Sequence, residues 1–289
     1  MRLVQSWLEA LAAIDALLGR SVPPMVLTGA GCSTQAGIPA YRDRDGQWAH
    51  PRPVQFGEFR RSVQARRRYW ARSFQGWPRF ERAQPTVTHR ALVALERGGF
   101  VGETVTQNVD RLHSQAGAKG VIDLHGRLDT VLCLECQERQ SRAAIQDQLL
   151  ALNPGADALS DGGASAVRPD GDRDVSAEAV AAFRYADCQR CGGILKPDVV
   201  FFGENVPAAR AQAARERLAT ASGLFVVGSS LMVLSGYRFV REAVAAGKPV
   251  VVLTRGRTRA DDDPITRIDL ESGELLSAVV ESCGIALPD

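Results

Sequence analysis

Four of the six cysteines stand in two pairs of identical spacing, and such a pattern can hold a metal ion. Cys133 and Cys136 form the first pair, and Cys188 and Cys191 form the second. A two-residue gap lets a tight turn direct both thiolates at one ion, and four thiolates fill the tetrahedral shell of Zn²⁺. The spacing therefore predicts one structural zinc ion, because no position is left open for catalysis.

Two other interpretations of these cysteines remain open. They could form disulfides in an exported protein, or they could include a redox dithiol. Both are weaker than the zinc interpretation, because we expect no signal peptide and a redox dithiol does not need a second pair. We expect Cys32 and Cys283 to be ordinary buried thiols.

A glycine-rich turn follows the apolar segment 25–28 and could receive an anion. Gly29 and Gly31 allow a tight turn and a close approach of phosphate groups. The backbone N–H groups that could point at a pyrophosphate belong to Ala30, Cys32 and Ser33. Thr34 stands where the dinucleotide fingerprint requires a third glycine, so the turn is typical of a nucleotide site but not of a dehydrogenase. A turn that only joins a strand to a helix is the simpler alternative.

Alternating strands and helices must position these residues. The expected strands are 25–28, 103–107, 199–202, 224–227 and 250–254. Expected helices include 88–96, 207–220 and 237–246, and residues 2–18 should form an amphipathic surface helix. This alternation predicts an α/β fold with a Rossmann-like parallel sheet, helices on both faces, and ligands at the carboxyl ends of the strands.

Two segments interrupt the alternation and are expected to be insertions. Residues 47–84 are rich in arginine and aromatic side chains, and residues 127–195 carry both cysteine pairs. We therefore expect residues 1–46, 85–126 and 196–289 to form a nucleotide-binding domain, and the insertions to form a smaller zinc-binding and helical domain. Residues 153–176 are rich in Gly, Asp, Ser and Pro and should be a long surface loop.

The charge balance argues against nucleic acid or a membrane as a partner. The 35 basic and 33 acidic residues leave a formal net charge of only +2. The arginines at positions 60, 61 and 66–68 are interpreted as a solvated helix face rather than a phosphate site. No apolar run reaches the roughly 18 residues of a membrane span. We expect a cytoplasmic protein, and the sequence does not indicate its oligomeric state.

Six motifs occur in one order along the chain. They are GAGCSTQAGIPAYR, TQNVDRLH, LHG at residues 124–126, the paired C-x-x-C, KPDVVFFGE and VVGSSLMV. In this order they resemble the sirtuins, which are NAD-dependent protein-lysine deacylases. The segments RRRYWARSFQGWPRF, DTVLCLEC, LKPDVVFFGE and SSLMVLSGYRF are most similar to the class II branch, which includes the mitochondrial sirtuin four. The resemblance extends from about Val22 to the end of the sequence.

The resemblance implies NAD as cofactor and an acylated-lysine protein or peptide as substrate. Nicotinamide would leave the ribose C1′, and the carbonyl oxygen of the acyl group would attack that carbon. His125 matches the catalytic base of the family, Asn108 the residue that orients the ribose and a water, and Asp110 the acid of the nicotinamide pocket. A helix cap is the structural alternative for Asp110. His113 could also cap a helix, while His89 and His50 have no accompanying motif.

The implied NAD contacts come from five short segments. They are Gly29, Ala30, Gly31, Ser33, Thr34, Gly37, Tyr41, Arg42, Gln107, Asn108, Val109, Asp110, Gly228, Ser229, Ser230, Thr254, Arg255, Gly256 and Ser272. Some positions depart from the family pattern: Ala40 replaces an aspartate, Thr254 an asparagine, and Ser272 a cysteine. The loop at residues 40–41 could therefore be tuned differently.

The implied substrate contacts lie in two loops, 199–204 and 228–233, whose backbone edges would pair with an extended peptide. The contact residues are Val199, Phe201, Gly203, Glu204, Leu231 and Met232. Tyr69 and Arg72 have the spacing with which desuccinylating sirtuins bind an acidic acyl group. A surface-exposed Arg72 without this role is the alternative. Two rival functions are mono-ADP-ribosyl transfer from the same NAD site and a non-catalytic zinc-ribbon module that senses NAD.

Overall fold

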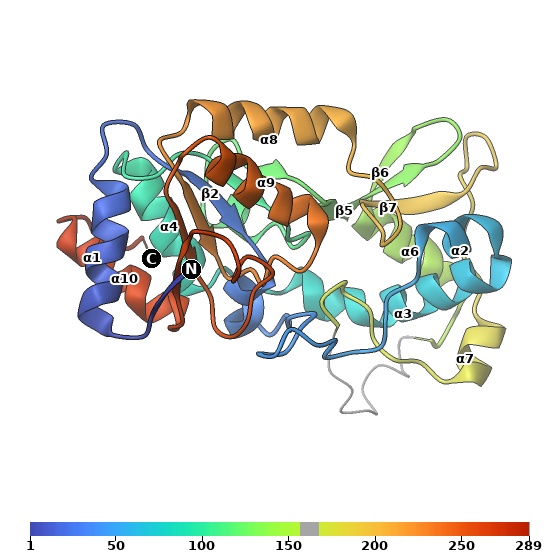
Figure 1. The fold of residues 1–289 in the computed structure, drawn as a ribbon. Helices are drawn as coiled ribbons and strands as arrows, with labels where there is room; N and C mark the ends of the chain where they lie inside the picture. Colours follow the sequence, from blue (N-terminus) through green and yellow to red (C-terminus); the bar gives the residue numbers. More distant parts are fainter. Residues whose placement is uncertain (157–167, 289) are drawn as a thin grey trace. The chain divides into compact units, whose positions relative to one another are not determined.

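The computed structural model describes residues 1–156 and 168–288, which form two compact units (Figure 1). The first unit consists of Met1–His50, Gln84–Leu124 and Val206–Asp289. The second unit consists of Pro51–Ala83 and His125–Asn205. Part of the expected surface loop, residues 157–167, lies outside the described residues.

The first unit is built on a seven-stranded parallel sheet, in the described part of the chain, with the order β1-β10-β9-β8-β2-β3-β4. Its strands are β1 Arg2–Val4, β2 Met25–Thr28, β3 Thr104–Thr106, β4 Ile122–Asp123, β8 Leu224–Val227, β9 Val250–Leu253 and β10 Thr266–Ile268. Every residue of β2, β8 and β9 is buried. Unbroken apolar runs fit strands that are covered on both faces.

Helices cover both faces of this sheet, which confirms the predicted fold class. Phe225 and Val227 of β8 pack with α1 (Trp7–Leu18), α4 (Val87–Arg97) and α10 (Ser272–Ser282). Leu224 and Val226 pack on the other face with α8 (Ala208–Thr220) and α9 (Leu234–Ala245). Alternate residues of a strand point to opposite faces, so one four-residue strand contributes to both cores.

Two expectations for the first unit need correction. Residues 2–18 are not one helix, because Arg2–Val4 form β1 and pair in parallel with Thr266–Ile268 of β10. The helix begins only at Trp7, after the extended residue Ser6. Strand β10 was not expected, since its middle residue is Arg267, which is buried although it is charged.

In its described residues, the second unit combines a small antiparallel sheet with four helices. The sheet has the order β6-β5-β7, from β5 Gly126–Cys133, β6 Arg139–Ser141 and β7 Leu195–Val199. The helices are α2 Phe56–Arg61, α3 Val63–Glu81, α6 Arg142–Leu152 and α7 Ala177–Ala182. The expected strand 199–202 is therefore wrong, because the strand ends at Val199 and belongs to this sheet. Phe201 instead packs edge-on against the ring of Phe59, with a centroid distance of 5.1 Å.

The end of the expected surface loop is buried in the second unit. Arg168 and Asp172 are 6% and 3% exposed, so the expectation is wrong for this part of the segment. Gly76 of α3 explains the close packing, because a Cβ there would lie 2.0 Å from the carbonyl oxygen of Gly171. Gly171 itself has a φ of +74°, which favours glycine.

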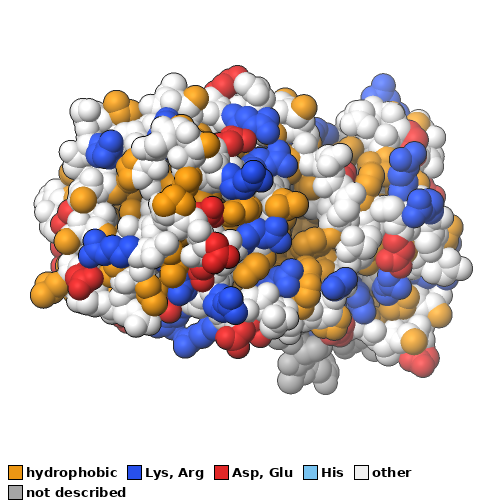
Figure 2. All heavy atoms as spheres, in the orientation of Figure 1, with side chains coloured by type: hydrophobic (Ala, Val, Ile, Leu, Met, Phe, Trp, Pro, Cys, Tyr) orange, Lys and Arg blue, Asp and Glu red, His pale blue; other side chains and the backbone are white. Residues whose placement is uncertain are grey.

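The arginine-rich segment is only partly a solvated face. Arg66 donates to the carbonyl oxygens of Phe59 and Arg60, and Arg67 donates to that of Ala181. Over the face drawn in Figure 2, basic side chains are interspersed with acidic and apolar ones, in keeping with the balanced composition. None of the described helices has both the length and the apolar character needed to cross a bilayer.

Candidate functional site

The glycine-rich turn packs directly on the turn that follows the neighbouring strand β8. A Cβ on Gly29 would lie 2.7 Å from Cβ of Ser229, and a Cβ on Gly31 would lie 2.8 Å from Cα of Gly228. Gly31 N–H also donates to Gly228 O at 2.8 Å. Glycine is thus required so that two backbone turns can meet at the carboxyl ends of β2 and β8.

The turn continues as a 3₁₀ helix, Ala30–Ala36, which ends at Gly37 with a φ of +80°. Cys32 N–H donates to Gly29 O at 3.0 Å, so it is not the phosphate donor suggested by the sequence. The Cys32 thiol donates to Val227 O, and burial raises its pKa to about 12. Cys32 is the ordinary buried thiol that was expected, whereas Cys283 is only partly buried.

The turn after β3 is hydrogen-bonded to both of these turns. Asn108 Nδ2 donates to Gly29 O and to Ser33 Oγ, each at 3.1 Å. Ser33 Oγ in turn donates to Asp110 Oδ2 at 2.6 Å. Gln107 Nε2 donates to Ser229 Oγ at 2.8 Å. These hydrogen bonds therefore bring six of the predicted site residues together at the three turns.

Asp110 has the geometry of a cap as well as its place in the cluster. Its Oδ1 accepts from Leu112 N–H at 2.9 Å, at the start of the short helix α5 (Leu112–Gln115). Burial raises the pKa of Asp110, and the hydrogen bond from Ser33 opposes this rise. The intervening Arg111 adopts a φ of +67°, which is unusual for a residue with a side chain.

The loop after Pro39 places Tyr41 and Arg42 around one aromatic ring. The Arg42 guanidinium lies 3.8 Å from the ring centroid of Trp48, and Tyr41 meets that ring edge-on at 6.4 Å. Arg42 also donates to Gly46 O at 3.2 Å. Both predicted residues are thus held by a small hairpin within the first unit.

The residues predicted on the adenosine side lie after β9 and at the start of α10. Thr254 is buried, and its N–H donates to Ile268 O at 3.1 Å. Ser272 Oγ lies 3.0 Å from Thr88 Oγ1. Gly256 has a φ of +83°, and a Cβ there would lie 2.4 Å from the carbonyl oxygen of Arg44. Arg255 is exposed.

His125 is the first residue of the second segment of the second unit, directly before β5. It is half-buried, and its carbonyl oxygen accepts from Val200 N–H at 2.7 Å. The backbone of the predicted base is therefore fixed to the residue that follows β7. The nearby loop is held in a similar way, because Glu204 accepts from Phe201 N–H and pairs with the buried Lys196 at 3.1 Å.

Tyr69 and Arg72 lie on α3 beside a group of carboxylates that the sequence did not suggest. The Tyr69 ring is buried and meets Phe59 edge-on at 5.4 Å. Arg72 is half-buried, and its Nη2 lies 3.5 Å from Asp174 Oδ1. Burial raises the pKa of Asp172, while Arg72 lowers it. The guanidinium that could receive an acidic acyl group therefore already faces acidic groups of the chain.

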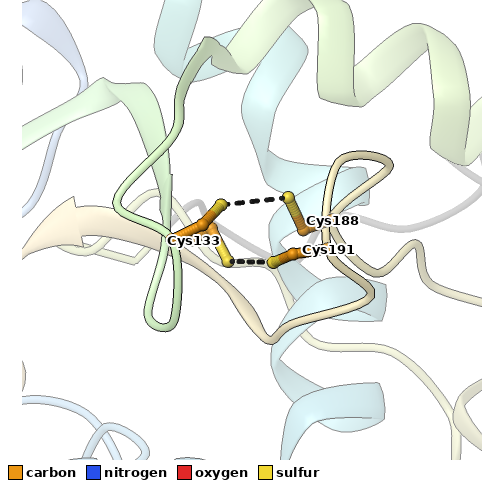
Figure 3. Close-up of side chains that lie close together, drawn as sticks. Cys133, Cys188 and Cys191 are labelled. Atoms are coloured by element: carbon orange, nitrogen blue, oxygen red, sulfur yellow. Dashed lines mark hydrogen bonds between the residues drawn. The ribbon is translucent and has the colours of Figure 1, made fainter.

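The four paired cysteines converge as predicted for a zinc site. Their Sγ atoms all lie within 4.8 Å of one another, and Figure 3 shows Cys133, Cys188 and Cys191 directed toward a common point. The Sγ atoms of Cys133 and Cys191 are 3.5 Å apart, and those of Cys136 and Cys188 are 3.7 Å apart. Tetrahedral zinc with Zn–S bonds of about 2.3 Å requires about 3.8 Å.

The backbone around the cysteines fits this arrangement. A Cβ on Gly193 would lie 2.8 Å from the Cys133 sulfur, so only glycine lets the chain pass there. Gly192 has a φ of +73° and turns the second cysteine pair. The four free thiols are therefore a suitable ligand set for one structural zinc ion.

Comparison with known proteins gives a consistent result. The sequence profile of the Sir2 family matches residues 29–235. The chain is 52% identical over 263 residues to the NAD-dependent protein deacetylase of Xanthomonas axonopodis pv. citri (strain 306), covering 91% of this chain and 84% of the relative. It is 48% identical over 277 residues to that of Bordetella bronchiseptica (strain ATCC BAA-588 / NCTC 13252 / RB50), covering 96% of this chain and 100% of the relative.

Solved structures show the same similarity in three dimensions. Sir2 with a p53 peptide and NAD+ superimposes with a TM-score of 0.71 and 27% identity, covering 93% of this chain and 96% of that chain. Sir2 bound to an acetylated peptide gives a TM-score of 0.73 and 26% identity, covering 96% and 99%. The similarity thus includes residues of both units.

Proposed function

This chain belongs to the Sir2 family, and from that premise we propose that it is an NAD-dependent protein deacetylase. One observation carries the proposal: the turns after β2, β3 and β8 are joined through Ser33, Asn108 and Ser229 at one edge of the parallel sheet. Ligands of open α/β sheets bind at this edge. The substrate is an acetylated lysine of a protein or peptide, as in the Sir2 complex with an acetylated peptide.

NAD suits the donor set at this edge, which consists of amide, hydroxyl and backbone groups. When bound, NAD supplies a ribose whose bond to nicotinamide can break, so that its C1′ can accept the acyl oxygen. We assign the contacts to the turns at residues 29–37, 107–110 and 228–230 and to Thr254, Arg255, Gly256 and Ser272. Tyr41 and Arg42 contribute from the neighbouring loop.

Asn108 and Asp110 have distinct roles in this proposal. Both amide hydrogens of Asn108 are used by Gly29 O and Ser33 Oγ, so a ribose hydroxyl or a water would meet the amide oxygen. Asp110 would accept a hydrogen bond from the nicotinamide carboxamide. Ser33 is hydrogen-bonded to both side chains and thereby fixes their positions relative to each other.

His125 is the proposed general base, which removes a proton from a ribose hydroxyl. An imidazole suits this step because it exchanges protons near neutral pH. We expect His125→Ala to lower deacetylation at least 100-fold, as is typical for loss of a general base. Mass spectrometry of the O-acetyl-ADP-ribose formed from NAD and an acetyl-lysine peptide measures the effect. His50→Ala is the matched control, because His50 has no motif and should leave the rate unchanged.

The products also separate the proposal from its alternatives. If ADP-ribose becomes attached to protein and no O-acetyl-ADP-ribose forms, the protein is a mono-ADP-ribosyltransferase and not a deacetylase. Equal nicotinamide release by the wild type and His125→Ala would show that His125 is not the base. No nicotinamide release by the wild type would leave only an NAD-sensing role.

We propose that the acylated peptide contacts Val199, Phe201, Gly203 and Glu204 from one loop and Leu231 and Met232 from another. Tyr69 and Arg72 are the proposed contacts of the distal acyl chain, in line with the proposed class II branch. Because Asp174 already pairs with Arg72, an acidic acyl chain would have to displace an internal carboxylate. We therefore expect acetyl-lysine to be preferred over glutaryl-lysine.

A panel of acetyl-, glutaryl- and lipoyl-lysine peptides at equal enzyme concentration tests the acyl specificity. We expect Asp174→Asn to increase the relative rate with the glutaryl peptide several-fold, because it leaves Arg72 with one fewer carboxylate partner. Arg72→Ala should abolish that increase. If neither substitution changes the preference for acetyl-lysine, Arg72 does not contact the acyl chain.

We also propose a division of roles between the two units. The first unit would carry the NAD contacts, and the second would hold the zinc ion. The second unit contains most of the predicted insertions 47–84 and 127–195, together with residues 196–205. A cytoplasmic location is proposed on the basis of the four free thiols, because cysteines are kept reduced in the cytoplasm.

A further inference from the structure

A row of buried polar side chains lies beneath the turns of the proposed active site, in the core of the first unit. His89 is 0% exposed and His113 is 2% exposed, although neither has an assigned role in the reaction. His113 lies within α5 rather than capping it, so the cap suggested by the sequence is wrong. The two imidazole rings have a centroid distance of 4.6 Å.

His113 is connected to Asn108 by hydrogen bonds through two threonines. Its Nε2 lies 2.8 Å from Thr28 Oγ1, which donates to Thr106 Oγ1 at 2.9 Å. Thr106 Oγ1 also accepts from the backbone N–H of Asn108 at 3.1 Å. Thr28 and Thr106 are the last residues of β2 and β3, so this path joins the two strands where each enters an active-site turn.

His89 is connected to the glycine-rich turn by hydrogen bonds through Thr86. Its Nδ1 accepts from Thr86 N–H at 3.2 Å, at the start of α4. The hydroxyl of Thr86 donates to the carbonyl oxygen of Cys32 at 2.8 Å. The row therefore has one end on the turn after β2 and the other end on the turn after β3.

The direction of one of these bonds assigns the tautomer of His113. Since Thr28 donates to Thr106, its oxygen must accept from His113, which places the proton of His113 on Nε2. His89 Nδ1 also lies 2.8 Å from Thr86 Oγ1. His89 Nε2 and His113 Nδ1 are both buried without a hydrogen-bond partner among the described residues.

We propose that His89 and His113 form a positioning pair that holds the glycine-rich turn and the Asn108 turn in register for NAD. The inference rests on the proposed function of these turns. The contact between the two rings joins the two halves of the row. Parallel pairing of β2 with β3 fixes the strands themselves, whereas the row fixes the first residues beyond them.

Thr106 offers the sharpest test, because two substitutions differ in a single group. Thr106→Val keeps the shape but leaves the Asn108 N–H without its acceptor, while Thr106→Ser keeps the hydroxyl. We expect Thr106→Val to lower kcat/KM for NAD at least tenfold and Thr106→Ser to stay within threefold of wild type. The KM for the acetyl-lysine peptide should change less than twofold in both.

His113 provides the second pair of variants. The amide of glutamine can reach the position of Nε2 and contact Thr28, so we expect His113→Gln to recover most of the activity that His113→Leu loses. The melting temperature and zinc content are measured for each variant to verify folding. If Thr106→Val or His113→Leu lowers the melting temperature but keeps kcat/KM for NAD within twofold of wild type, the positioning role is wrong.

The outcomes also distinguish this inference from the proposed function. If the wild type releases no nicotinamide with the acetyl-lysine peptide, the proposed function fails. Calorimetry with NAD alone still compares the Thr106 variants, and a tenfold weaker affinity of Thr106→Val than of Thr106→Ser supports the positioning role. Equal affinities in that experiment overturn it.

Discussion

Ser33 shows how a single hydroxyl can organise two functional side chains. It accepts from Asn108 and donates to Asp110, so the hydrogen bonds run in one direction from amide to carboxylate. A hydroxyl is well suited to this because it has both a donor and an acceptor. The resemblance to sirtuins indicates each of these residues, but only the structure shows that Ser33 joins them.

The buried His113 makes the stability of the protein depend on pH. Burial lowers the pKa of His113 to about 4, while an unfolded histidine titrates near 6.5. The unfolded chain therefore binds a proton more readily as the pH falls below about 6.5, and the contribution of neutral His113 is lost progressively toward pH 4. His89 acts in the same direction, because its pKa is also lowered by burial.

We expect the wild type to lose about 2 kcal/mol more free energy of unfolding than His113→Gln between pH 7 and pH 5. Urea denaturation at several pH values measures this difference. Asp110, with its raised pKa, is present in both proteins, so its opposite contribution cancels in the comparison. Parallel pH profiles of the two proteins would contradict the prediction.

Residues whose partners are near in sequence were the ones that could be predicted. The geometry of the cysteine pairs and of the glycine-rich turn depends on residues only two or three positions apart. The row of His89, His113, Thr28 and Thr106 could not be predicted in the same way, because its members come from four separate segments.

At the scale of elements, a zinc ion bound to the four cysteines would join the two loops that carry the cysteine pairs. Cys133 ends β5, and Cys188 and Cys191 precede β7. We expect Cys133→Ala to reduce bound zinc from about one ion per chain to near zero, measured with a colorimetric chelator. The melting temperature should fall by about 5 °C or more, because binding of a structural metal contributes folding free energy.

Cys283→Ala is the matched control for the zinc experiment. Cys283 lies outside the cluster, directly after α10, so its loss should leave the zinc content unchanged. Unchanged zinc content in Cys133→Ala would rule out this residue as a ligand. A disulfide-linked protein would instead resist chelators and lose stability in reducing agents.

Long apolar elements were predicted well, and short or polar ones were not. The predicted bounds of β2 and β8 are confirmed, because these strands are three and four consecutive buried apolar residues, followed in β2 by the buried Thr28. Strand β10 escaped prediction because Arg267 lies at its centre. The predicted position of strand β7 was wrong by several residues. Phe201 was assigned to the strand because it is apolar, but it packs in an aromatic cluster instead.

At the scale of the whole molecule, the chain leaves the first unit twice and returns to it. The sheet of that unit is assembled from Met1–His50, Gln84–Leu124 and Val206–Asp289. The predicted insertions 47–84 and 127–195 rest on a change of composition from alternating strands and helices to arginine-rich and cysteine-bearing sequence. The composition could not predict the buried segment at Arg168 and Asp172, whose glycine, proline and aspartate residues are typical of exposed loops.

The pairing of Arg2 with Thr266 has a consequence for how the protein emerges during synthesis. Strand β1 cannot pair until the much later strand β10 has left the ribosome. Contacts so distant along the chain form late in folding. Until then Leu3 and Val4 have no partner strand and are available to other apolar segments of the chain.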